Sequence, residues 1–173
     1  MKSRRSKFIL PMLAVLILSS PVLPQTRQSS KTESRMGYWI NFGFGRSTLG
    51  WLAGSANLTV SIDRLALSLR GTTNSEGLFL DDFWDVAALV GWGKQHGRRY
   101  IAFGLGLAVV GGYRSAGLFS ANRPVPLTPG FAVESQWFIR ARRWLGAGLY
   151  AYLNLNGEET FGGITLCVQV GKY

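Results

Sequence analysis

The chain has 173 residues, 47% of them hydrophobic, and its 19 Lys and Arg outnumber its 9 Asp and Glu. This length suits one domain. The single cysteine, Cys167, excludes an intramolecular disulfide and a cysteine metal cluster.

The first 24 residues are predicted to be a secretory signal peptide. Basic residues precede an apolar run from Phe8 to Leu18, which is shorter than the roughly 20 residues that span a bilayer as a helix. A retained signal anchor is the alternative. Residues 25–35 are polar and lack periodicity, so we expect a flexible periplasmic segment there.

The basic balance does not indicate a nucleic-acid partner. Without the four basic residues of the leader, 15 basic residues stand against 9 acidic ones, a net charge of +6. These residues are spread over the polar segment 25–35 and the predicted turns, and they form no single stripe of the kind that binds nucleic acid. We expect turn charges near anionic headgroups or in the periplasm.

Eight segments with alternating apolar residues follow residue 35. In the second segment, Leu58 and Val60 alternate with Asn57 and Thr59, the period of a β-strand with two different faces. The predicted strands are residues 36–47, 53–62, 65–71, 83–94, 99–111, 130–139, 144–153 and 160–173.

The two faces of these strands favour a membrane barrel. One face is apolar, while the other carries glycine, alanine, serine, asparagine and tyrosine with almost no charge. A soluble exported barrel of the lipocalin type would leave that weakly polar face in water. We therefore predict an all-β fold for residues 36–173, an eight-stranded antiparallel up-and-down transmembrane β-barrel with the apolar face outward.

The connections alternate in length. Those at 63–64, 95–98 and 140–143 are short, whereas 72–82 and 112–129 are long, and the last contains three prolines. Barrels of this kind keep short turns on the periplasmic side, which here also holds both ends of the barrel. Aromatic residues gather near both ends of the strands, as in the two belts of a membrane barrel. Tyr100 and Trp144 have lumen parity.

Three charged residues fall well inside the strands on the lumen face. They are Arg70, Asp85 and Glu134. We predict a buried charge network in which Asp85 holds Arg70 and Glu134 is a second partner, because unpaired charges in a narrow lumen are costly. A structural plug, with tyrosines filling the interior, is the favoured role. A gate or a proton site is the alternative.

The sequence indicates no catalytic, cofactor or metal site. His96 is the only histidine and lies in a predicted periplasmic turn, whereas a lipid A-modifying site would lie at the outer leaflet. One histidine is too few for a metal centre. The glycine-rich runs lack the lysine of a nucleotide-binding loop.

The chain resembles the small eight-stranded outer-membrane barrels of Gram-negative bacteria, of the OmpX and OmpA N-terminal type. The resemblance rests on the leader, the strand number, the loop asymmetry and the last strand, GGITLCVQVGKY. Tyr173 differs in parity from Val168 and Val170, which implies a kink near Gly171.

The resemblance implies an outer-membrane location and, as partners, outer-membrane lipids, periplasmic chaperones and the barrel-assembly machinery. It implies a non-enzymatic role, structural or in surface interaction through the loops 72–82 and 112–129. A narrow or gated pore is the alternative, and a lipid-modifying enzyme is a third possibility.

Overall fold

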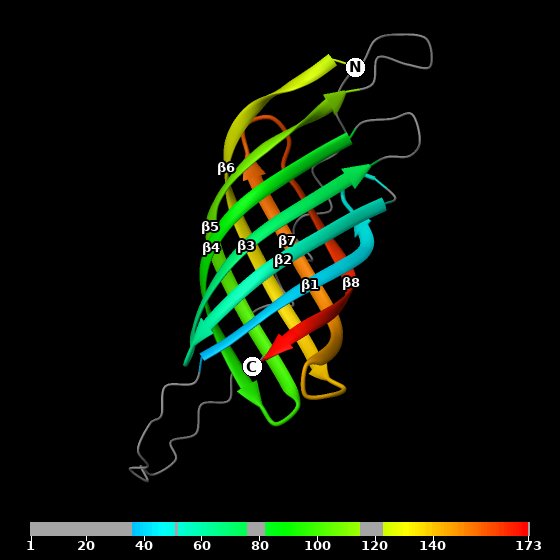
Figure 1. Ribbon diagram of the computed structural model, residues 1–173. Helices are drawn as coiled ribbons and strands as arrows, with labels where there is room; N and C mark the ends of the chain where they lie inside the picture. Colours follow the sequence, from blue (N-terminus) through cyan, green and yellow to red (C-terminus); the bar gives the residue numbers. More distant parts are fainter. Residues whose placement is uncertain (1–35, 51, 76–81, 115–122, 173) are drawn as a thin grey trace, which may run out of the picture. The chain divides into compact units, whose positions relative to one another are not determined.

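The computed structural model describes residues 36–50, 52–75, 82–114 and 123–172, and these residues form eight antiparallel strands (Figure 1). The predicted signal peptide, 1–24, and the predicted periplasmic segment, 25–35, lie outside the described residues. No helix among the described residues is long and apolar enough to cross a membrane.

The strands follow one another around the sheet in chain order. They are β1 (Met36–Ser47), β2 (Leu52–Ile62), β3 (Leu65–Ser75), β4 (Asp82–His96), β5 (Arg99–Arg114), β6 (Arg123–Arg140), β7 (Leu145–Asn156) and β8 (Phe161–Lys172). The predicted number and order of strands are confirmed.

The sheet closes on itself. Each strand pairs with its neighbours in sequence, and β8 pairs with β1, where Tyr38 lies opposite Lys172. The beginning of β1 and the end of β8 therefore lie at the same end of the barrel, together with the short turns between β2 and β3, β4 and β5, and β6 and β7. We call this end the turn end.

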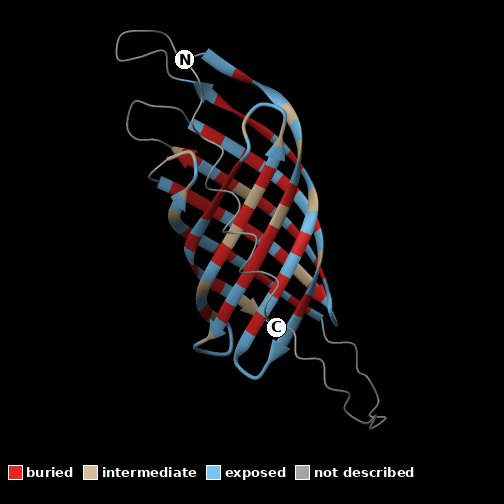
Figure 2. Ribbon diagram, turned by 180° about the vertical axis from the view of Figure 1, so that it is seen from behind, coloured by how far each residue is buried: buried red, intermediate tan, exposed pale blue. Residues whose placement is uncertain are grey.

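The predicted division of the strands into two faces is confirmed. Buried and exposed positions alternate along most of each strand, and the exceptions are runs of three buried residues in β2, β5, β6 and β8 and the irregular first half of β6 (Figure 2). Leu58 is exposed, whereas its neighbours Asn57 and Thr59 are fully buried. The apolar face points outward, and the inward face combines small and polar side chains with buried aromatic ones such as Trp39, Phe138 and Tyr150.

The two predicted long loops are shorter than expected, because the strands on both sides continue. β3 extends to Ser75 and β4 begins at Asp82, while β5 extends to Arg114 and β6 begins at Arg123. The prolines of 112–129 lie within β6, not in a loop. Residues 123–129 pair with β5 but not with β7, whose pairing begins at Gly130. Proline is tolerated there because one side of the strand is an open edge.

The β5–β6 hairpin contains a β-bulge. Val110 pairs with Thr128 and Gly112 with Val125, so β6 contains one extra residue between these pairs. Gly112 has φ 155°, and a Cβ atom there would lie 2.1 Å from the Asp82 carbonyl oxygen. Bulges of this kind bend strands at the rims of barrels.

Trp144 departs from its predicted place on the lumen side. It precedes β7 and is exposed, since β7 begins only at Leu145. The amides of Ala141 and Arg142 both donate to the Leu145 carbonyl oxygen, each at 2.9 Å, so Trp144 belongs to a tight turn and its side chain is exposed. Tyr173 lies outside the described residues.

Close approach of β4 and β5 makes Gly106 a testable position. A Cβ atom there would lie 1.9 Å from the Ala88 carbonyl oxygen and 2.7 Å from the Leu89 Cα atom. Both are backbone atoms of β4, which cannot move away as a flexible side chain could. We expect Gly106→Ala to lower the free energy of unfolding by about 1–3 kcal/mol, measured by urea unfolding in detergent micelles. Gly157→Ala is the control, because nothing lies within 4 Å of that position. Equal stability of the two variants would contradict the close approach.

Candidate functional site in the barrel lumen

The three predicted lumen charges all lie in the interior. Arg70 is carried by β3, Asp85 by β4 and Glu134 by β6, and they are 1%, 1% and 3% exposed. Each lies on the inward face of its strand, as its position in the alternation predicts. Their burial means that every charge needs a partner inside the barrel.

Arg70 is held from two sides. Its Nη2 atom forms an ion pair with Asp85 Oδ2, and its Nη1 atom donates to the Val133 carbonyl oxygen at 3.1 Å. Arg70 lies opposite Ala87 in the ladder and Thr72 lies opposite Asp85, so the ion pair runs diagonally between adjacent strands. The guanidinium also lies 5.5 Å from the centre of the Tyr152 ring, within the range of a cation–π interaction.

The carboxylate of Asp85 has further donors. Thr72 Oγ1 donates to Oδ1 at 2.5 Å, and Asn154 Nδ2 donates to Oδ2 at 2.7 Å. Tyr152 donates to Asn74 Oδ1 in the same region. The Arg70–Asp85 pair thus joins side chains of β3, β4 and β7 with the backbone of β6.

The hydrogen-bond partners of Glu134 are neutral side chains. Its carboxylate accepts hydrogen bonds from Tyr150 at 2.6 Å, from Asn57 at 2.9 Å and from Gln136 at 2.9 Å. All three groups are neutral donors, and the carboxylate oxygens of Glu134 accept all three hydrogen bonds. Within the described residues, the hydrogen bonds of Glu134 join β2, β6 and β7, whereas the ion pair of Arg70 is made with Asp85.

A second tier of polar side chains supports Glu134. Thr59 donates to Asn57 Oδ1 at 2.5 Å, and Gln136 Nε2 lies 3.3 Å from Thr59 Oγ1. Trp39 Nε1 donates to Gln136 Oε1 at 3.3 Å. The polar contacts therefore continue to β1.

Aromatic side chains fill much of the remaining interior. Trp39 and Tyr100 meet edge to face near the turn end with ring centres 4.7 Å apart, and Tyr150 stacks on Tyr152 at 6.2 Å. A Cβ atom at Gly93 would lie 2.3 Å from the Tyr100 hydroxyl oxygen. The lumen glycine there leaves room for the tyrosine, as expected for a narrow eight-stranded interior.

Two other residues singled out in the sequence lie away from this network. His96 is exposed at the end of β4, beside the turn at Gly97. Cys167 is buried, and its Sγ atom lies 3.3 Å from Thr165 Oγ1. Among the described residues, no group of three His, Cys, Asp or Glu side chains could hold a metal ion.

Sequence reasoning missed most of the neutral partners. They are Asn57, Thr72, Gln136, Tyr150 and Asn154. Asn57, Gln136 and Tyr150 have lumen parity within the predicted strands, so parity could have named them as interior residues. Thr72 and Asn154 lie just beyond the predicted ends of their strands, which continue further in the structure. Which of them meet depends on how far each strand is shifted along its neighbours, and alternation does not contain that information.

The fold is similar to that of several solved outer-membrane proteins, although the sequences have diverged widely. The N-terminal β-barrel domain of Pseudomonas aeruginosa OprF matches with a TM-score of 0.59 and 10% identity, over 80% of this chain and 99% of that one. Neisserial surface protein A matches with a TM-score of 0.53 and 14% identity, over 78% of this chain and 94% of that one. Ail of Yersinia pestis matches with a TM-score of 0.51 and 12% identity, over 79% of this chain and 99% of that one.

These matches confirm the predicted resemblance at the level of the fold. No protein-family model matches the chain, and no curated protein matches it by sequence. At these identities the likeness shows the architecture alone.

Removal of Arg70 tests the role of the network in stability. Arg70→Ala leaves Asp85 buried without its counter-charge, so we expect a loss of about 3–5 kcal/mol in the free energy of unfolding. Adding Asp85→Asn removes that charge and should restore part of the lost free energy of unfolding. Both variants are measured by urea unfolding in micelles. Glu134→Gln in the Arg70→Ala background is the matched control, because Glu134 is bound to other partners. If it rescues as well as Asp85→Asn, the pairing of Arg70 with Asp85 is not the dominant interaction.

Proposed function

We propose that this protein is a bacterial outer-membrane barrel without enzymatic activity, whose role is structural or lies in interactions at the outer end. The observation that carries this proposal is the apolar exterior. Exposed large apolar side chains come from all eight strands, and Phe44, Leu107 and Leu166 are each at least 67% exposed. An apolar surface of this extent is incompatible with water and fits the hydrocarbon of a bilayer.

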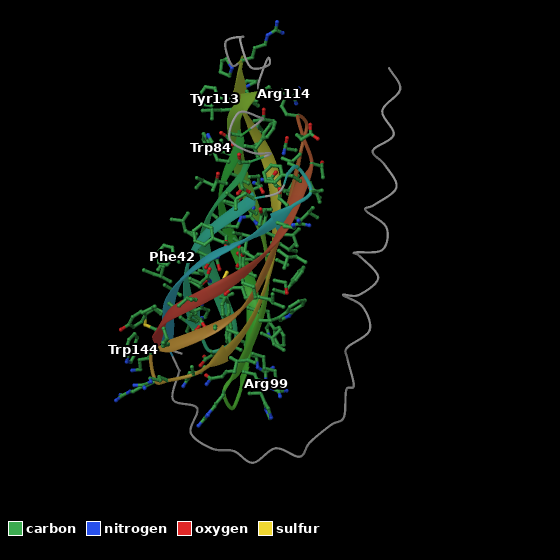
Figure 3. All side chains as sticks on the ribbon, turned by 90° about the vertical axis from the view of Figure 1, so that its right-hand side faces the viewer. Phe42, Trp84, Arg99, Tyr113, Arg114 and Trp144 are labelled. Atoms are coloured by element: carbon green, nitrogen blue, oxygen red, sulfur yellow. The ribbon has the colours of Figure 1, made fainter. Side chains whose placement is uncertain are left out.

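The arrangement of the two ends supports an orientation. Trp84, Tyr113 and Arg114 lie at one end, and Trp144 and Arg99 lie at the turn end (Figure 3). Exposed aromatic side chains therefore flank the apolar band, as expected at two membrane interfaces. Short turns belong to the periplasmic side of such barrels. We assign the turn end to the periplasm and the opposite end to the cell exterior.

The filled lumen favours a structural role over transport. The Arg70–Asp85 group and the Glu134 group lie side by side across the interior and connect side chains of β1, β2, β3, β4, β6 and β7. Permeation would require these buried hydrogen bonds to break, and buried polar groups without partners are costly. We therefore assign the network to stability rather than to a gate.

The outer end offers a surface for interaction in the long β5–β6 hairpin. Tyr113 and Leu127 are exposed there. Arg114 lies 3.6 Å from Glu159 of the β7–β8 connection and over the ring of Phe83, at 5.9 Å, so several connections meet at this point. Ail of Yersinia pestis has been solved with the heparin analogue sucrose octasulfate. Surface recognition is the corresponding proposal for this chain.

A pair of substitutions on β5 tests membrane insertion. Leu105 and Tyr113 face outward and are 53% and 55% exposed, so a soluble protein would tolerate arginine equally at both. Leu105 lies between the aromatic belts and Tyr113 near the outer rim. We expect Leu105→Arg to cost about 2–4 kcal/mol and Tyr113→Arg about 0–1 kcal/mol, from unfolding in lipid vesicles. Equal costs would contradict insertion at this depth.

Planar-bilayer recording tests the assignment of the lumen. We expect the folded protein to show no steady conductance, because the network occupies the lumen. Insertion is checked independently by heat-modifiability, the shift in gel mobility between unboiled and boiled samples. Steady single-channel steps that change with Arg70→Ala would favour the gated pore instead.

A further inference from the structure

The basic residues of the barrel are concentrated at the turn end. Among the described residues, one acidic side chain, Asp63, belongs to that end. The basic side chains there are Arg64, Lys94, Arg98, Arg99, Arg140, Arg142, Arg143 and Lys172. The opposite end is balanced, with Arg46, Arg114 and Arg123 against Asp82, Glu158 and Glu159 in its described part. Among the described residues, the turn end therefore carries the stronger attraction for anions.

One place at the turn end combines this charge with an apolar hollow. A shallow hollow of about 230 Å³ is lined by Tyr38, Arg143, Trp144, Val170, Gly171 and Lys172. It lies where β1 and β8 meet the β6–β7 turn. Two of the lining side chains are cations, two are aromatic, and Val170 continues into the outward apolar face of β8.

Backbone contacts fix the hollow. The Gly171 amide donates to the Trp144 carbonyl oxygen at 2.9 Å, which ties the β6–β7 turn to the end of β8. Tyr38 lies opposite Lys172 in the β1–β8 ladder. A Cβ atom at Gly171 would lie 2.2 Å from the Tyr38 carbonyl oxygen. Glycine at this position thus allows the close approach that brings Tyr38, Trp144 and Lys172 around one hollow.

We infer that this hollow binds the headgroup of an anionic phospholipid of the inner leaflet. The phosphodiester would lie between Arg143 and Lys172, which form no ion pair with the other described residues. The glycerol region would contact Tyr38 and Trp144, which are 56% and 58% exposed, since aromatic rings favour the headgroup level. An acyl chain would follow Val170 and then Val168 along β8. The inference rests on the proposed membrane location and orientation.

The test measures lipid binding by the full chain folded in neutral maltoside micelles. Dissociation constants for short-chain phosphatidylglycerol and phosphatidylcholine are obtained by native mass spectrometry, and inorganic phosphate is a third probe. We expect phosphatidylglycerol to bind tightest. Arg143→Gln with Lys172→Gln should weaken its binding roughly thirtyfold, the effect of two basic side chains near an anionic headgroup.

The matched control removes two equally basic side chains from another turn. Arg98→Gln with Arg99→Gln should change phosphatidylglycerol binding less than threefold. Trp144→Ala keeps both cations and should also weaken the binding of phosphatidylglycerol. It serves as a second variant if the first does not fold.

Three results would overturn the inference. Equal weakening by the two double variants would indicate a diffuse charge effect. Equal affinities for phosphatidylglycerol and phosphatidylcholine would indicate no headgroup recognition. Inorganic phosphate binding as tightly as the lipid would indicate an anion site without a lipid. Failure of the unaltered protein to show heat-modifiability would instead refute the proposed function.

Discussion

The closure of β8 onto β1 is the constraint on which the rest of the structure depends. A sheet in hydrocarbon has no water to satisfy its edge, so every strand must find a partner on both sides over the depth of the bilayer. Eight strands meet this requirement with an interior only wide enough for side chains. Closure thereby sends the apolar face outward and forces the small and polar face into a confined space. The open edge of β6 at residues 123–129 is confined to one end of the barrel, where prolines are tolerated.

The confined lumen then determines how its charges are held. One guanidinium and two carboxylates share the space, and they do not form a simple triad. Arg70 is paired with Asp85, while Glu134 is surrounded by the donors of Tyr150, Asn57 and Gln136. Three neutral donors can stabilise a buried carboxylate because bonds to ionised groups are stronger than neutral ones. The lumen therefore holds two polar groups that connect most of the barrel wall, and this arrangement suits a plug better than a pathway.

The two ends of the barrel differ in both shape and charge. The turn end has tight connections, a concentration of basic side chains and the hollow between Tyr38 and Trp144. The other end has the extended β5–β6 hairpin, and the charges of its described residues are balanced, with Arg114 near Glu159. A barrel that must keep one orientation in an asymmetric membrane can use such differences, since each end meets a different surface. The proposed lipid binding at one end and the proposed recognition at the other are compatible because the length of the barrel separates them.

The sequence by itself determined the strand number, the outward face of every strand and the burial of Arg70, Asp85 and Glu134. These follow from alternation along single strands, a local property with a period of two. The tertiary structure decided which residues of different strands meet, and alternation along one strand does not contain that information. The shift between neighbouring strands placed Arg70 diagonal to Asp85 and brought Asn57 and Tyr150 to Glu134. Pairing with β5 drew the prolines of 123–129 into β6, although proline alone predicts a loop. The tight turn at residues 141–144 includes Trp144, whose side chain is exposed although its parity predicted the lumen.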